Sequence, residues 1–196
     1  MSSGKLARIS EGLGAAAVIV EGSEAGGHLG TNRSSREIVP EVLKAVKNIP
    51  VIGAGGVLDG KDIVEMMKLG ANGVQMGSRF AASEECNASD ELKKMYLRAK
   101  APEDVVLIES PVGLPGQAIR NKFAASVLDG TVPPPTECDR CLKHCSHKFC
   151  LIKALERAQQ GDVETGLVFS GNNMRKVDEI LPVKEISVVV SGSISD

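Results

Sequence analysis

Aromatic side chains are scarce in this sequence. Its 196 residues include no Trp, one Tyr and four Phe, so aromatics make up 3% of the chain. Proteins that bind single-stranded nucleic acids stack the bases on aromatic rings, and this sequence cannot supply such a platform. Basic blocks are also missing, because 23 Lys and Arg residues stand against 25 Asp and Glu, for a net charge of −2. We therefore expect no nucleic-acid partner.

Long apolar runs are missing as well. No stretch approaches the roughly 18 consecutive apolar residues that cross a bilayer, and the opening "MSSGKLARIS" has no apolar signal core. Four of the five cysteines crowd into "CDRCLKHCSHKFC", unlike the dispersed disulfide framework of a small secreted domain. We expect a cytoplasmic protein without a membrane partner. Its hydrophobic content of 42% is enough for a packed core.

Short apolar runs alternate with helix-like stretches up to Phe80. The apolar run from Ala16 to Val20 predicts a strand buried on both faces, and "IPVIGAGG" and "NGVQMG" predict two further strands. Helices are predicted for segments 5–13, 40–48 and 59–69, with Pro40 at the first helical position of the second and a capping pair of Asp59 and Asp62 opening the third. Strands joined by single helices form right-handed parallel units, so the predicted class is α/β.

The later part of the chain gives weaker signals. A strand is predicted at "DVVLIES", followed by a turn at "PVGLPGQ" and a helix from Ala118 to Leu128. The stretch "GTVPPPTE" predicts a stiff boundary. After it, Thr136 is expected to cap one helix reaching Ala158. The tail "ISVVVSGSISD" is expected to be weakly structured.

A glycine-rich loop follows each strand predicted before Phe80. These loops are Gly22 to Gly30, Gly53 to Gly56, and Gly77 with Ser78. Ligands of parallel α/β proteins bind at the carboxyl ends of the strands, and bare backbone N–H groups suit a phosphate. Tight turns also use glycine for conformational reasons alone. The succession of loops favours a phosphate site.

His28 lies within the first of these loops and is the only histidine outside the cysteine-rich stretch. An imidazole with an ordinary pKa near 6.5 can accept a proton at physiological pH. A lone histidine is more often structural, but the position of His28 on the ligand face favours catalysis. Glu21 ends the preceding strand, where it either caps backbone donors or hydrogen-bonds a ligand.

The cysteine-rich stretch has the spacing C-x2-C-x3-C-x4-C, formed by Cys138, Cys141, Cys145 and Cys150. This spacing fits zinc or an iron–sulfur cluster, so all four are candidate metal ligands. On one helix, however, the first three would share a face with Leu142, Phe149 and Ile152 and behave as small core hydrophobes. One helix cannot surround an ion with four ligands, so we favour core thiols and no metal.

Four motifs in this order carry a family resemblance: "VIVEGSEAGGHLG", "IPVIGAGGVLDG", "GANGVQMGSRF" and "GLPGQAIRNKF". They resemble the nitronate monooxygenase family, formerly called 2-nitropropane dioxygenases, to which flavin-dependent enoyl-acyl-carrier-protein reductases are related. The resemblance covers about Gly4 to Phe123, and "GDVETGLVFSGNN" is similar to the family's C-terminal segment.

The resemblance implies a flavoprotein with a TIM (β/α)8 barrel fold and FMN as cofactor. His28 becomes the catalytic base of an oxidoreductase that converts nitroalkanes or alkyl nitronates, with O2, into a carbonyl compound and nitrite. The FMN phosphate would rest on four backbone amides, and other residues would line the remaining pocket. The implied cofactor-binding residues are Gly55, Gly56, Gly77 and Ser78 for the phosphate, and Glu21, Gly22, Gly27, Gln75 and Met76 for the rest.

A complete barrel of this kind needs roughly 200 to 250 residues, yet only three barrel strands are predicted before Phe80. The resemblance aligns "SSGKLARI" with the end of the family's fifth strand. We therefore expect an N-terminally truncated partial barrel over 1–130, a helical cysteine-containing extension over 131–186 and a tail over 187–196. Such a chain is expected to bind FMN weakly by itself and to need a complementary barrel half or a homo-oligomer.

Three alternatives stay open. An enoyl-acyl-carrier-protein reductase would use FMN and NAD(P)H on an enoyl thioester. An isomerase or lyase of the phosphate-binding barrel type would use the same glycine loops for a substrate phosphate. In a non-enzymatic hypothesis, the chain is an inactive fragment or one half of a split barrel that acts only with a partner chain.

Overall fold

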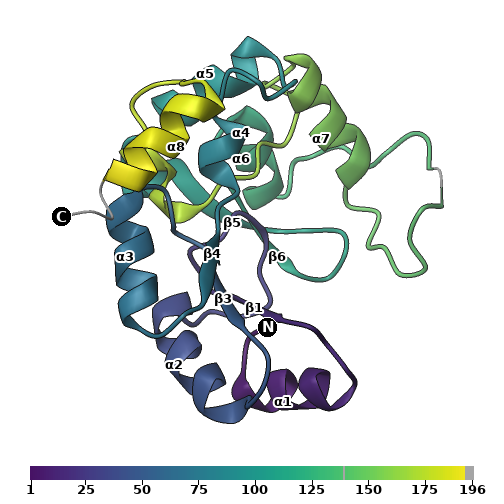
Figure 1. The fold of residues 1–196 in the computed structure, drawn as a ribbon. Helices are drawn as coiled ribbons and strands as arrows, with labels where there is room; N and C mark the ends of the chain where they lie inside the picture. The colour runs from purple at the N-terminus through teal and green to yellow at the C-terminus, as the bar shows by residue number, and fades with distance from the viewer. Residues whose placement is uncertain (139, 193–196) are drawn as a thin grey trace.

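A computed structural model describes residues 1–138 and 140–192 and confirms the α/β class (Figure 1). The elements are, in chain order, α1 Gly4–Gly12, β1 Val18–Glu21, β2 Gly27–His28, α2 Ser35–Ala45, β3 Val51–Ala54, α3 Gly60–Lys68, β4 Gly73–Gln75, α4 Ser78–Ala81, α5 Asp90–Arg98, η1 Pro102–Asp104, β5 Val105–Glu109, β6 Pro115–Ile119, α6 Lys122–Leu128, α7 Leu151–Gln160, η2 Asn172–Lys176 and α8 Val183–Gly192.

The predicted strands before Phe80 form one parallel sheet in the order β1-β3-β4. Val18 of β1 pairs with Val51 of β3, and Ile52 pairs with Gly73 of β4. Helices α2 and α3 connect the strands and pack against them. The carboxyl ends of the three strands therefore meet at one edge of the sheet, where ligands of such sheets bind.

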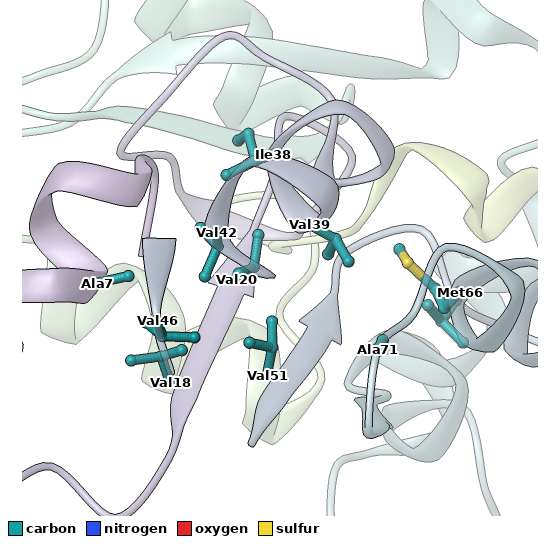
Figure 2. Close-up of a cluster of buried hydrophobic side chains, with 11 residues drawn as sticks. Ala7, Val18, Val20, Ile38, Val39, Val42, Val46, Val51, Met66 and Ala71 are labelled. Carbon is teal, nitrogen blue, oxygen red and sulfur yellow. The ribbon is translucent and has the colours of Figure 1, made fainter. Parts of the chain in front are cut away.

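The core of this half lies between the parallel sheet and α2 (Figure 2). Val18 and Val20 of β1 are buried against Ile38 and Val42 of α2. Burying each such side chain contributes about 1.5–3 kcal/mol. Between the two valines, Ile19 is 44% exposed. The prediction that this strand is buried on both faces is therefore wrong.

A second sheet, which the sequence did not predict, is antiparallel and has the order β2-β6-β5. Its short strand β2 pairs Gly27 with Gln117 and His28 with Gly116. The predicted helix from Ala118 is wrong at its start, because Ala118 and Ile119 complete β6. The helix begins only after Asn121, whose side chain accepts a hydrogen bond from the N–H of Ala124 at 2.8 Å.

Helix α2 begins five residues before the predicted position. Ser34 is its N-cap, and its hydroxyl accepts a hydrogen bond from the N–H of Arg36 at 3.2 Å. Pro40 lies inside this helix, not at its first position. Pro40 has no N–H and therefore removes one hydrogen bond of the helix. The N-cap and the burial of Ile38 and Val39 stabilise the longer helix by more than this loss costs.

Two predictions for the C-terminal part are also wrong. No helix starts at Thr136, since the described residues between α6 and α7 form a long loop, seen on the right of Figure 1. The prolines of this loop and the left-handed backbone at Arg140 (φ 51°) and His147 (φ 56°) interrupt a helix. The predicted weak tail contains most of α8, which packs along α3 and buries Ile186. Residues 193–196 of that tail lie outside the described residues.

Membrane insertion finds no support in the helices of the described ranges. None of them is both long enough and apolar enough to cross a bilayer.

Candidate functional site

A cavity of about 300 Å³ lies at the carboxyl ends of β1, β3 and β4. The glycine-rich loops after all three strands contribute to its wall, as expected for this edge of a parallel sheet. Gly22 and Met76 do not line it, since Gly22 packs against the start of α2 and Met76 against the core. The predicted residues that do line the cavity are Glu21, Gly27, Gly55, Gly56, Gln75, Gly77 and Ser78.

The glycines of the second loop are required by its backbone. Gly55 and Gly56 have φ values of +91° and +72°, in the left-handed region that favours glycine. A Cβ atom on Gly56 would also lie 2.9 Å from the side chains of Glu24 and Asn173. At Gly77 the position of a Cβ atom is open space.

Backbone N–H groups of these loops are available to a ligand. Within the described residues, no protein group accepts a hydrogen bond from the N–H of Gly56, Gly77 or Ser78. All three residues line the cavity and none is fully buried, so these free donors can reach an anion bound there.

The segment 169–174 forms the opposite wall of the cavity and is hydrogen-bonded to the glycine-rich loops. The N–H of Gly171 donates to Ser78 Oγ at 3.1 Å, and Asn173 Nδ2 donates to the carbonyl of Gly56 at 2.7 Å. Sequence reasoning missed this wall, although "VFSGNN" lay within the stretch similar to the family's C-terminal segment. The lining residues it missed include Glu24, Gly26, Tyr96, Phe169, Gly171, Asn173 and Met174.

Two carboxylates near the cavity differ in their environment. Glu24 is held by the protein, since it accepts hydrogen bonds from the hydroxyl of Ser34 and from the N–H of Ser35. The Glu21 carboxylate accepts no hydrogen bond from protein in the described part of the chain, and its burial raises its pKa. Of the two roles considered for Glu21, capping backbone donors is therefore not the observed one.

His28 stands beside the cavity instead of in its wall. Its Nε2 atom lies 2.7 Å from Ser110 Oγ, and its ring meets that of Phe169 edge to face, with centroids 5.1 Å apart. Gly27 and Phe169, its chain neighbour and its ring partner, both line the cavity. Burial lowers the pKa of His28, which keeps the imidazole neutral and able to accept a proton near pH 7. Sequence reasoning missed Ser110.

A second cavity, of about 720 Å³, is lined in part by Ser110, the hydrogen-bond partner of His28. One wall is the turn 109–115, which includes Ser110, and the other is the segment 142–148 of the long loop. The space next to the His28–Ser110 pair is thus large enough for a small-molecule substrate.

The cysteines do not behave as predicted. Cys138 and Cys141 are exposed, and Cys145 and Cys150 are half-buried, so the core-thiol interpretation is wrong. Its premise, a helix through all four, is absent. Among residues 1–138 and 140–192, no three side chains of the His, Cys, Asp or Glu type are placed to hold a metal ion.

Comparisons with known proteins agree with the motifs. The family described as nitronate monooxygenase matches residues 1–191. A probable nitronate monooxygenase of Staphylococcus haemolyticus is 36% identical over 137 residues, which cover 64% of this chain and 38% of that relative. A similar protein of Staphylococcus aureus strain Newman is 35% identical over 135 residues, again covering 38% of its length.

Solved structures match the whole chain. FabK from Thermotoga maritima has a TM-score of 0.84 and 34% identity, over 100% of this chain and 59% of that one. Nitroalkane oxidase from Streptomyces ansochromogenes has a TM-score of 0.79 and 26% identity, over 100% of this chain and 56% of that one. This chain thus spans well under two thirds of the length of these relatives. It belongs to the nitronate monooxygenase family.

Proposed function

We propose that this chain carries the cofactor-phosphate site and the proton acceptor of an FMN-dependent oxidoreductase that oxidises nitroalkanes or alkyl nitronates with O2. One observation carries the proposal: three successive glycine loops line one cavity, and a neutral histidine stands beside it. Membership of the nitronate monooxygenase family supports the same activity.

The residues present fit FMN. The free N–H groups of Gly56, Gly77 and Ser78 suit a phosphate dianion, and the open space at Gly77 lets it approach the backbone. Glu21 lines the same cavity, its burial raises its pKa, and no described protein group donates a hydrogen bond to its carboxylate, so the carboxylate can accept one from a hydroxyl or N–H group of the cofactor. When bound, FMN supplies the oxidation–reduction chemistry between substrate carbon and oxygen.

His28 handles the substrate proton in this proposal. Its neutral imidazole accepts the α-proton of a nitroalkane, and Ser110 fixes the orientation of the ring. An alkyl nitronate has already lost this proton and does not need the base. The two substrates therefore separate proton transfer from the later oxidation.

The test compares both substrates in the wild-type chain and in His28→Ala, each supplied with FMN and any complementary barrel half it needs. Oxygen uptake and nitrite release are measured. We expect turnover of the neutral nitroalkane to fall about 10²- to 10⁴-fold while nitronate turnover falls far less. Equal losses on both substrates, with FMN still bound, would contradict a proton-accepting role for His28.

A second candidate function is enoyl-acyl-carrier-protein reduction. It is favoured by the likeness to FabK, an enoyl-acyl-carrier-protein reductase, which extends over the whole chain at 34% identity. NAD(P)H oxidation that depends on an enoyl thioester, without nitrite release from nitronates, would favour this candidate. Both candidates use the same cavity and the same histidine.

We also propose that β1, β3 and β4 are three strands of a TIM barrel completed by further strands. Within the described residues β1 and β4 are the edges of the sheet, and Ile19 of β1 is 44% exposed. Among the described residues, only Met1 is bonded to the outer edge of β1: it accepts from the N–H of Glu21 and donates to the carbonyl of Ile19. Both edges of the sheet therefore leave room for further strands. Flavin absorbance after desalting tests it: little FMN should stay on this chain alone, and stoichiometric retention would contradict the need for completion.

A further inference from the structure

The four clustered cysteines surround a cavity that has no role in the proposed function. Cys138, Cys141, Cys145 and Cys150 all line one small cavity of about 90 Å³. Its other wall includes Pro111 and Val112, from the turn that carries Ser110. The fifth cysteine, Cys86, is not among the lining residues.

Packing does not explain this gathering of thiols. A buried thiol acts as a small hydrophobe, but Cys138 and Cys141 are exposed and no helix turns them toward the core. None of the five cysteines forms a disulfide. Four free thiols around one cavity at the surface of a chain are most simply explained by a shared ligand.

The local backbone suits thiolate ligands. The N–H of His147 donates to Cys145 Sγ at 3.4 Å, the kind of hydrogen bond to sulfur that surrounds thiolate-bound metal centres. Arg140 and His147 adopt the left-handed conformation, which turns the chain sharply between successive cysteines.

We propose that Cys138, Cys141, Cys145 and Cys150 form a tetrathiolate site for a thiophilic metal centre, either an iron–sulfur cluster or a single Zn²⁺ ion. Both centres take four cysteine thiolates. The described residues do not present three ligands at binding distance, so the four thiols come together only when the centre binds. Binding and local ordering are then coupled, as in other small metal sites.

The segment 142–148, which contains Cys145, is already anchored to the turn 109–115. The N–H of Ser146 donates to the carbonyl of Pro111 at 3.0 Å, and Lys148 pairs with Glu109. Residues 142–148 also line the cavity next to Ser110. A metal centre would therefore fix the wall beside the His28–Ser110 pair, yet it does not depend on which reaction that pair serves.

The test is metal analysis of the whole chain purified without oxygen. Separate samples are reconstituted with Fe²⁺ and sulfide or with Zn²⁺, and Co²⁺ serves as an optical probe of tetrahedral thiolate coordination. We expect either about four iron and four sulfide per chain, or about one zinc per chain. Iron with sulfide identifies a cluster, and zinc alone identifies a single ion. Absence of binding in every arm would overturn the proposal.

Single Cys→Ser variants locate the site. Replacing Cys138, Cys141, Cys145 or Cys150 should remove most of the bound metal, whereas Cys86→Ser should retain it. Far-UV circular dichroism checks that each variant keeps its helices. Equal metal content in the four variants and in the Cys86→Ser control would contradict the site.

Alkylation of the unmodified sequence gives a readout that needs no variant. Bound metal should slow iodoacetamide labelling of the four clustered cysteines by about tenfold or more, as mapped by mass spectrometry, with Cys86 as the internal reference. Labelling rates that do not change with metal at the four positions would count against the proposal.

Discussion

The Nε2 atom of His28 lies 2.7 Å from Oγ of Ser110, a residue 82 positions further along the chain. The contact joins the short strand β2 to the turn between β5 and β6. The same hydroxyl lies 3.5 Å from the N–H of Val112, which donates to it. The conformation of the turn places the Ser110 hydroxyl. That hydroxyl in turn sets the orientation of the imidazole and which ring nitrogen carries its proton.

Replacing Ser110 with Ala should misorient the imidazole without removing it. We expect turnover of a neutral nitroalkane by the FMN-loaded assembly to fall about 10- to 100-fold, because small errors in the placement of a base are costly. Ser146→Ala is a matched control, since Ser146 lines the same larger cavity but does not contact His28. Steady-state rates that are equal in the two variants would contradict a positioning role for Ser110.

The lowered pKa of His28 predicts how stability depends on pH. The unfolded chain protonates this residue near pH 6.5, whereas the folded chain does so only at lower pH. The unfolded state thus binds more protons below pH 6.5, and folding stability falls as the pH decreases through that range. The free energy of unfolding of His28→Gln should therefore rise relative to wild type between pH 7.5 and pH 5, as measured by urea denaturation. A difference that stays constant with pH would contradict this.

Gly56 is predicted to be essential for cofactor retention. An alanine there would be strained at φ +72° and would meet Glu24 and Asn173 at 2.9 Å, so the loop must move away from the cavity. Gly130→Ala is the matched control, because Gly130 has a similar φ of +68° but open space around a Cβ atom. Both variants carry a backbone strain of about 1–2 kcal/mol. Only Gly56→Ala should lose FMN in a fluorescence titration of the completed barrel, and equal affinity in both would contradict the phosphate site.

The parallel half of the fold could be predicted because its signals are local. Asp59 shows this, since its side chain accepts a hydrogen bond from the N–H of Asp62 at 2.9 Å and opens α3 as the sequence indicates. The glycine loops were found because bare amides at strand ends have a recognisable composition. Their convergence on one cavity follows from parallel strand order alone.

The antiparallel sheet could not be predicted in the same way. Strand β2 has only two residues, Gly27 and His28, and exists because distant Gly116 and Gln117 pair with it. Short strands of this kind are set by tertiary contacts and leave no periodic pattern. Ser110 and Phe169 escaped notice for the same reason, because their proximity to His28 depends on that pairing.

We expect Tyr96, the only tyrosine, to ionise only at high pH and to stabilise the wall of the cavity at the strand ends. Burial raises its pKa to about 12, and its hydroxyl donates to the carbonyl of Phe169 at 3.2 Å. Tyr96→Phe should lose about 1 kcal/mol of unfolding free energy at pH 7. Because the unfolded tyrosine ionises near pH 10, wild-type stability should fall relative to Tyr96→Phe as the pH rises above 10. Urea denaturation of both proteins at pH 7 and above pH 10 measures this. A difference in unfolding free energy between them that is the same at the two pH values would contradict the prediction.

Met66 should be the more sensitive of two adjacent methionines in α3. Its side chain is fully buried in the core of Figure 2, where its sulfur lies 2.9 Å from the position that a Cβ atom on Gly53 would take. Met66→Ala leaves a cavity against β3 and should cost about 2–5 kcal/mol of unfolding free energy. Met67 is 47% exposed, so Met67→Ala should cost no more than about 0.5 kcal/mol. Equal losses in urea denaturation would mean that α3 does not pack on the sheet through Met66, and the loop after β3 would then lack the support that positions Gly55 and Gly56.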